Sequence, residues 1–214
     1  MSLPLFIYVH GFNSSPESIK ARLLGEYFSA LEQENGHKYS ENYLVPQLSH
    51  EPAEAMRQLE SIVTDNRQRP IVLIGSSLGG YFSIWLTEHY ENCKAVMVNP
   101  AIYPYRLLSE WLGDNENIYT HERYILTRDH LQQLEAMVVD QVKDPARYLL
   151  LVQSADETLD YREAVDFFDR SIAFIQPGGS HGFDQFEKLI PAIIGFSQGR
   201  LELPEAIPLP PFSE

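Results

Sequence analysis

Residues 71–79 read Ile-Val-Leu-Ile-Gly-Ser-Ser-Leu-Gly and contain the pattern Gly-x-Ser-x-Gly centred on Ser77. The apolar run 71–74 is typical of a strand buried on both faces, and the stretch from about Leu78 to Tyr90 predicts a helix directly after it. Small residues two positions before and after Ser77 let strand and helix approach closely, which exposes the serine on a sharp turn. The stretch therefore predicts a strand, a nucleophilic serine and a helix in immediate succession.

Two other interpretations of this glycine-rich turn are a plain helix entry and a phosphate-binding loop. The nucleotide-binding patterns Gly-x-x-x-x-Gly-Lys-Ser/Thr and Gly-x-Gly-x-x-Gly are both absent from the chain. Ser76 does not fit the nucleophile position, because the residue two places after it is Leu78. These observations favour Ser77 as the nucleophile.

Short apolar runs alternate with amphipathic stretches along most of the chain. Besides residues 71–74, five further runs predict strands: 5–9, 43–48, 95–98, 148–152 and 172–175. Stretches with helical periodicity lie between them, so we expect an α/β fold of about six mostly parallel strands with helices on both faces. Pro46 has no N–H to donate to a sheet, so it marks the run 43–48 as a strand end or an edge.

The length of 214 residues fits one domain, which we place at residues 1–198. Residues 100–147 break the alternation, with two turn-like segments and one helix near 131–142, and we interpret them as a small lid insertion. Residues 199–214 hold four of the 14 prolines and predict an extended C-terminal tail. Such a tail packs against its own domain or against a neighbouring chain, so an oligomer formed through the tail is one alternative.

Composition argues against several classes of protein. The net charge of −14, from 16 basic and 30 acidic residues, argues against nucleic acids and anionic membranes as partners. No apolar stretch approaches the roughly 20 residues that span a bilayer, and the start of the chain lacks the basic region of a secretory signal. Cys93 is the single cysteine, so no internal disulfide can form, and we expect a cytoplasmic protein.

A nucleophilic serine on such a turn needs an acid and a histidine that follow it in the order serine, acid, histidine. Of the histidines after Ser77, only His181 comes directly after a predicted core strand, in the stretch Gly-Gly-Ser-His-Gly-Phe. Asp156 follows the preceding strand and is our first choice for the acid. Two alternatives stay open: Asp160, which also matches the start of a helix capping box, and Glu157.

The oxyanion that forms during acyl transfer needs two backbone N–H donors beside the serine. Leu78 directly follows the nucleophile and supplies one; the loop His10-Gly11-Phe12 after the first strand supplies the other through Phe12. We interpret His10 as a residue that braces this loop. The chain has no His-Glu-x-x-His motif and no cysteine–histidine cluster, so we expect neither a metal nor an organic cofactor.

Side chains for a substrate pocket are expected from the lid and from the strand beside the serine. The candidates are Asn99, which ends that strand, and five aromatic residues of the lid: Tyr103, Tyr105, Trp111, Tyr119 and Tyr124. An alternative of equal weight is that these aromatic residues pack the lid onto the body. Three lid arginines could form a basic patch for an anionic head group: Arg106, Arg123 and Arg128.

With these residues in place, the chain resembles an α/β-hydrolase, and more narrowly the YqiA-like small bacterial esterases. The matching stretches are HGFNSSP (10–16), IGSSLGGY (74–81), VNPA (98–101), DETLDYREA (156–164) and GGSHGF (178–183). The resemblance implies esterase activity on acyl esters, including acyl thioesters, with Ser77 as nucleophile, Asp156 as acid and His181 as base. The chain departs from that family at residues 154–155, where Ser-Ala replaces the usual Thr-Gly, and in its tail.

Together these features predict a serine hydrolase that cleaves small acyl esters or thioesters through an acyl-enzyme. Two alternatives remain, because one fold hosts many functions: an amide or peptide hydrolase on the same site, and a non-catalytic scaffold that binds a small ligand or a protein partner. A lid this short encloses little space, so we expect an open site rather than a deep tunnel.

Overall fold

Six parallel strands form the central sheet in the computed structural model, which describes residues 3–211 and every side chain among them except that of Asn35. The strands are β1 (Leu5–Val9), β2 (Tyr43–Leu44), β3 (Ile71–Ser77), β4 (Cys93–Pro100), β7 (Tyr148–Gln153) and β8 (Ile172–Gln176). Their order is β2-β1-β3-β4-β7-β8. The predicted six-stranded parallel sheet is confirmed. The strand order reverses between β1 and β3, and ligands of open α/β sheets bind at the carboxyl ends of strands at such a point.

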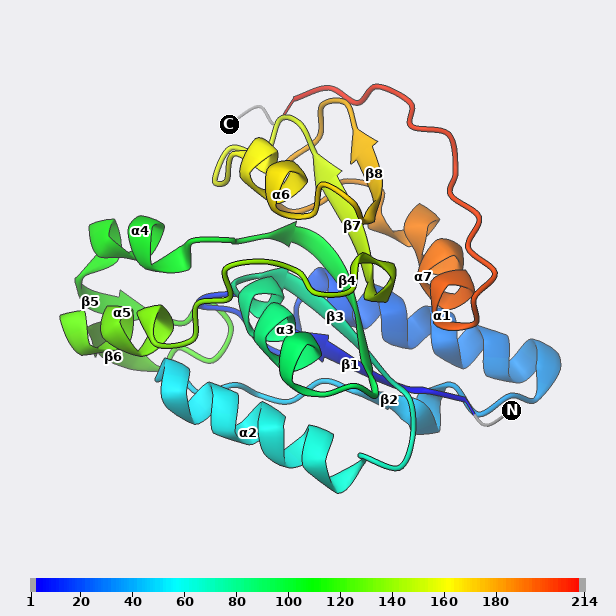
Figure 1. Cartoon of the computed structure of the whole chain (residues 1–214), viewed down its shortest axis with the longest axis horizontal. Coiled ribbons are helices and arrows are strands. Elements are labelled where there is room, and N and C mark those ends of the chain that lie inside the picture. Colours follow the sequence, from blue (N-terminus) through cyan, green and yellow to red (C-terminus); the bar gives the residue numbers. More distant parts are fainter. Residues whose placement is uncertain (1–2, 212–214) are drawn as a thin grey trace.

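Helices cover both faces of this sheet (Figure 1). One face packs against α1 (Ile19–Asn35) and α7 (Ile190–Ser197), and the other against α2 (Pro52–Asp65), α3 (Leu78–His89) and α6 (Tyr161–Phe167). Alternate residues of β1 enter the two cores: Ile7 and Val9 on the α3 side, Phe6 and Tyr8 on the α1 side. Because both faces are buried, the strands are continuous apolar runs, which is the pattern that predicted them.

Two predicted elements have different bounds in the structure. The strand predicted at 43–48 is only β2, at residues 43–44, and it stops before Pro46, which cannot donate to a ladder. The helix predicted at about 185–196 is divided into a 3-10 turn at Phe186–Leu189 and α7, with Pro191 in the first turn of α7, where its missing N–H costs nothing.

The insertion contains more regular structure than predicted. It holds α4 (Pro104–Leu108), an antiparallel hairpin of β5 (Gly113–Glu116) and β6 (Arg123–Leu126), and α5 (Arg128–Glu135). The prediction had turns and a helix near 131–142. The hairpin was not predicted, because β5 has the sequence Gly-Asp-Asn-Glu and these residues are uncommon in strands. These four elements lie together at the end of the sheet toward which the strands point (Figure 1).

The proline-rich tail, described as far as residue 211, lies against its own domain. It runs back from α7 past β8 (Figure 1), and the Leu209 N–H donates to the Pro177 carbonyl at 2.8 Å. The Gly179 N–H donates to the Pro210 carbonyl at 3.1 Å. The tail therefore supports the loop that leads to His181. None of the helices in residues 3–211 combines the length and hydropathy that crossing a membrane requires.

Candidate active site

Ser77 occupies a strained turn between β3 and α3. Its backbone has φ 54° and ψ −123°, a region that residues with a side chain rarely adopt. The turn is possible because α3 passes very close to β1: a Cβ on Gly79 would lie 1.9 Å from the Val9 carbonyl oxygen. The serine thus stands at the carboxyl end of β3, beside the point where the strand order reverses.

The side chains of Ser77, His181 and Asp156 form a continuous chain of contacts. His181 Nε2 lies 3.1 Å from Ser77 Oγ, and His181 Nδ1 lies 2.8 Å from Asp156 Oδ2. The carboxyl side chain of Asp156 is 2% exposed and the His181 ring 24% exposed. With an ionised Asp156, the neutral imidazole donates from Nδ1, which leaves the Nε2 lone pair free to accept the serine proton.

The three acidic candidates near residue 156 have different contacts. Asp156 turns one oxygen to His181, and its other oxygen accepts the N–H groups of Thr158 and Leu159, each at 2.8 Å. Asp160 caps α6 and pairs with the Arg162 guanidinium at 2.6 Å, which lowers the pKa of Asp160.

The side chain of Glu157 contacts the backbone of the same histidine. Its Oε2 accepts the N–H of His181 at 2.9 Å. Of the three acids, Asp156 is the one whose carboxylate meets the imidazole, and Glu157 holds the main chain at that residue.

A buried polar platform supports the histidine loop. The Asn99 side chain, which is 2% exposed, donates to the carbonyls of Ser180 at 3.0 Å and His181 at 3.1 Å, and accepts the Gln153 N–H at 2.9 Å. The Gln153 side chain is fully buried and accepts the N–H groups of Ser180 and Asp184, each at 2.9 Å. Asn99 therefore lies behind His181, with all its polar groups occupied, rather than in the cleft. Gln153 was not among the predicted site residues, although a glutamine at the end of an apolar strand can indicate a polar contact near the site.

The loop after β1 faces the serine. A Cβ on Gly11 would lie 3.1 Å from Ser77 Cβ, so this loop runs directly beside the nucleophile. Leu78 is the first residue of α3, so its N–H has no acceptor within the helix. Phe12 lines the cleft that contains Ser77. The two predicted N–H donors, of Leu78 and Phe12, therefore belong to two segments that both lie next to Ser77.

His10 braces this loop from beneath. Its Nε2 accepts the Leu48 N–H at 3.1 Å, and its Nδ1 lies 3.1 Å from the Gly11 carbonyl oxygen. Burial lowers the pKa of His10, which favours the neutral ring with its proton on Nδ1. The contacts are those of a structural residue.

The lid hairpin holds the same loop from above. The Tyr124 hydroxyl donates to Asn13 Oδ1 at 2.7 Å, and the Asn117 amide donates to the Ser14 carbonyl at 2.8 Å. These partners lie more than 100 residues apart in the chain. Tyr124 was predicted as an aromatic residue of the pocket, and its hydroxyl binds the β1 loop; Asn117 was not predicted, since no local pattern indicates such a contact.

A cleft of about 320 Å³ opens beside Ser77 and His181. Its described lining combines backbone and side chains of the β1 loop, the start of α1 and the lid, including Phe12, Lys20 and Tyr119. Of the predicted substrate residues, Tyr119 lines the cleft, and the rings of Trp111 and Tyr124 lie 6.0 Å and 6.5 Å from that of Phe12. Asn99, Tyr103, Tyr105 and Trp111 are not among the residues that line the cleft.

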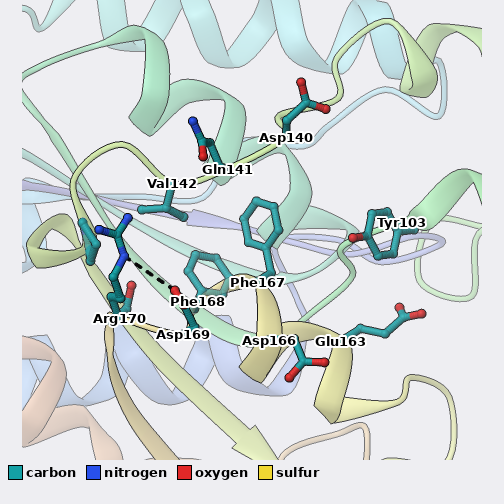
Figure 2. Close-up of a pocket in the computed structure, with 12 residues that line it drawn as sticks. Tyr103, Asp140, Gln141, Val142, Glu163, Asp166, Phe167, Phe168, Asp169 and Arg170 are labelled. Atoms are coloured by element: carbon teal, nitrogen blue, oxygen red, sulfur yellow. Dashed lines mark ion pairs between the residues drawn. The ribbon is translucent and has the colours of Figure 1, made fainter.

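A second, larger cavity of about 580 Å³ lies between α6 and the segment after α5 (Figure 2). Tyr103 lines it, and most of its charged side chains are acidic: Asp140, Glu163, Asp166 and Asp169, against the single Arg170. No residue of the Ser77–His181–Asp156 chain borders it. The candidate active site therefore adjoins the smaller cleft and not this larger cavity.

Two of the lid arginines are already paired with acids. Arg106 lies 3.8 Å from Glu163 and over the ring of Tyr103, and Arg123 donates to Glu116 at 2.8 Å. These two arginines thus face carboxylates of their own chain, and neither lines the cleft beside Ser77.

One group of side chains in residues 3–211 has the composition of a metal site. Ligand atoms of His50, Glu51 and His130 lie within 4.8 Å of one another. However, His130 Nδ1 accepts the N–H of Thr127 at 3.1 Å, so the neutral ring carries its proton on Nε2, the atom that lies 3.3 Å from Glu51. The contact between His130 and Glu51 joins the lid to the start of α2. Metal binding at Nε2 would need the other tautomer of His130.

The comparisons with known proteins agree with this fold. The model of a family described as Uncharacterised protein family (UPF0227) matches residues 5–198. Among curated proteins, Uncharacterized protein F37A4.1 of Caenorhabditis elegans is 33% identical over 92 residues, which are 43% of this chain. This chain spans only 18% of that relative's length.

Solved structures are similar over nearly the whole chain. A putative hydrolase from Agrobacterium vitis S4 has a TM-score of 0.68 at 15% identity, covering 94% of this chain and 91% of its own. Est1E from Butyrivibrio proteoclasticus, with ferulic acid bound, has a TM-score of 0.67 at 17% identity and coverages of 93% and 90%. The monoacylglycerol lipase of Paleococcus ferrophilus has a TM-score of 0.58 at 17% identity and coverages of 92% and 97%.

Sequence identities of 15–17% to these solved structures establish the fold alone. The match to the family model over residues 5–198 establishes the family. The resemblance to α/β-hydrolases seen in the sequence is confirmed. This chain belongs to the Uncharacterised protein family (UPF0227) and has the fold of α/β-hydrolases.

Proposed function

We propose that the protein is a serine hydrolase that cleaves small carboxylic esters, including acyl thioesters, through a covalent acyl-enzyme. The observation that carries this proposal is the chain of contacts from Ser77 Oγ to His181 Nε2 at 3.1 Å and from His181 Nδ1 to Asp156 at 2.8 Å. A serine hydroxyl is a weak nucleophile until a positioned base accepts its proton, and this arrangement supplies the base and the group that orients it.

In the first half-reaction, Ser77 Oγ attacks the carbonyl carbon while His181 Nε2 takes the hydroxyl proton. The N–H groups of Leu78 and Phe12 donate to the oxyanion, and Asp156 stabilises the imidazolium. The C–O or C–S bond then breaks, and His181 returns its proton to the leaving alcohol or thiol. In the second half-reaction, His181 activates a water that releases the acid from Ser77.

The surroundings support a small substrate in an open site. The cleft beside Ser77 measures about 320 Å³, at the lower end of the volumes that hold small molecules. The name of one structural neighbour, a monoacylglycerol lipase, fits an ester as the substrate. We assign Asn99 a positioning role behind His181 and keep Trp111 as a contact at the rim beside Phe12.

The decisive experiment combines covalent labelling with turnover. Wild-type protein and the variants Ser77→Ala and Ser76→Ala would be treated with a fluorescent fluorophosphonate and assayed on 4-nitrophenyl butyrate. We expect Ser77→Ala to lose both labelling and turnover and Ser76→Ala, its neighbour in the same turn, to retain both. A wild type without labelling would favour the scaffold alternative. A wild type that labels and cleaves a peptide 4-nitroanilide but no ester would favour the amide hydrolase.

A further inference from the structure

One charged side chain lies in the cleft and takes no part in the proposed chemistry. Lys20, in the first turn of α1, lines the cleft together with Ser77 and His181, and its Nζ donates to the Gly182 carbonyl at 2.8 Å. Of the described residues that line this cleft, Lys20 is the only lysine, arginine, aspartate or glutamate. The cleft of a protein with a net charge of −14 therefore contains one local positive charge.

The ammonium group has more donors than partners. An ammonium carries three N–H donors, and the contact that the structure gives to Lys20 is the single carbonyl of Gly182. Within residues 3–211 no carboxylate lies within 4 Å of its Nζ. The carboxylate of Asp156 attracts the ammonium electrostatically, but its oxygens already accept hydrogen bonds from His181 and from two backbone N–H groups. Burial lowers the pKa of Lys20 to about 8, so the side chain remains mostly charged at neutral pH.

Other hydrogen-bond donors surround the same spot. Ser18, which precedes α1 and lines the cleft, is 8% exposed, and its hydroxyl lies beside the Tyr8 phenol, whose pKa it lowers. Burial raises the pKa of the Tyr8 phenol well above its usual range, so this group stays protonated and can donate.

The end of α1 adds to this positive environment. The 17-residue helix has no acidic residue in its first turn and no side chain capping it. Its free N–H groups and its dipole favour a negative charge at this end. The Lys20 ammonium has one carbonyl as its partner and no carboxylate within 4 Å among the described residues, so it can bind an anionic group of a ligand.

We propose that Lys20, Ser18 and the start of α1 form a subsite for a carboxylate carried by the substrate, so that the ester cleaved at Ser77 is anionic. This inference rests on the proposed function, because the subsite adjoins the proposed nucleophile. It differs from the expected arginine patch of the lid, two of whose three members are paired with acids of their own chain. The carboxylate can belong to the acyl part or to the alcohol part of the ester.

The test compares matched neutral and anionic esters. On the acyl side, the pair is 4-nitrophenyl pentanoate and the 4-nitrophenyl monoester of glutaric acid, whose acyl chains have equal length. On the alcohol side, the pair is phenyl acetate and 3-carboxyphenyl acetate. The kcat/KM values would be measured for wild type, Lys20→Met, Lys20→Gln and Lys20→Arg, with Lys188→Met as a control that removes an exposed lysine from outside the cleft.

We expect Lys20→Met to lower kcat/KM for the anionic ester of at least one pair about 10- to 100-fold more than for its neutral partner. Lys20→Gln, which keeps an N–H donor but no charge, should behave like Lys20→Met. Lys20→Arg should retain part of the preference, and Lys188→Met should keep the wild-type ratio.

Equal losses on both members of each pair would overturn the subsite and leave Lys20 as a brace for Gly182. Failure of the proposed function has a different signature, because the wild type would then hydrolyse none of the four esters and resist the fluorophosphonate.

Discussion

The side-chain amide of Asn99, which does not line the cleft, donates to the backbone carbonyl of His181 at 3.1 Å. Asn99 ends β4 and His181 lies in the loop after β8, so this contact joins two strands that are not neighbours in the sheet. The same amide also donates to the Ser180 carbonyl. One buried side chain thus sets the position of the loop from which the proposed base reaches Ser77.

The variant Asn99→Asp tests this positioning role. The change keeps the shape of the side chain but turns a carboxylate oxygen toward two carbonyl oxygens, which repels the loop. We expect kcat to fall on the order of 10- to 100-fold with a smaller change in KM, because a displaced base reacts poorly with substrate already bound. The control Asn66→Asp removes an amide that donates to the Ile62 carbonyl at the end of α2, and should leave kcat unchanged. An equal effect of the two changes would refute the role.

The choice of Asp156 as the acid can be tested by charge removal. We expect Asp156→Asn to lower kcat by about three to four orders of magnitude, because the amide favours the wrong tautomer of His181 and cannot stabilise an imidazolium. Asp160→Asn removes a carboxylate that caps α6 and pairs with Arg162, so it should reduce stability slightly and leave kcat near the wild-type value. Steady-state kinetics on one ester distinguish the two, and the reverse ranking would assign the acid to Asp160.

The closeness of the β1 loop to the nucleophile predicts a steric effect at Gly11. A methyl group there meets Ser77 Cβ at 3.1 Å, so either the loop or the serine must shift by a few tenths of an ångström. We expect Gly11→Ala to retain its fold and lose on the order of tenfold or more in kcat.

A glycine of α1 provides the matched control for Gly11. In Gly25→Ala the new methyl makes ordinary contact with Tyr43 at 3.5 Å. That variant should gain roughly 0.5–1 kcal/mol of helix stability without a change in kcat. Urea denaturation and kinetics of both variants check the pair, and full activity in Gly11→Ala would contradict the prediction.

Lys20 should also leave a signature in the pH dependence of stability. Burial lowers its pKa from the usual 10.5 to about 8, so the unfolded chain holds this proton more tightly than the folded protein does. The charged lysine therefore opposes folding fully below pH 8, and this opposition fades as the pH rises from about 8 to 10.5. Relative to Lys20→Met, the wild type should gain stability across that interval. Urea unfolding of both proteins at pH 7 and pH 10 measures the difference, and a constant difference would rule out the lowered pKa.

Much of the fold follows from local patterns. The apolar runs placed all six strands of the sheet. The four inner strands, β1, β3, β4 and β7, are buried on both faces and are therefore apolar at almost every position, whereas the edge strands β2 and β8 are partly exposed. The lid hairpin did not follow, since β5 consists of glycine and polar residues and depends on contacts with Asn13 and Ser14 for its place.

The sequence by itself determined the nucleophile turn, the parallel sheet and the order of serine, acid and histidine, because each depends on neighbours in the chain: an apolar run, a glycine at a close approach, a residue after a strand. Only the tertiary structure decided which of three nearby acids meets His181, that Asn99 lies behind that ring, and that Lys20 enters the cleft. Those outcomes depend on contacts between residues 25 to 162 positions apart, which are set by how the loops at the carboxyl edge of the sheet pack together.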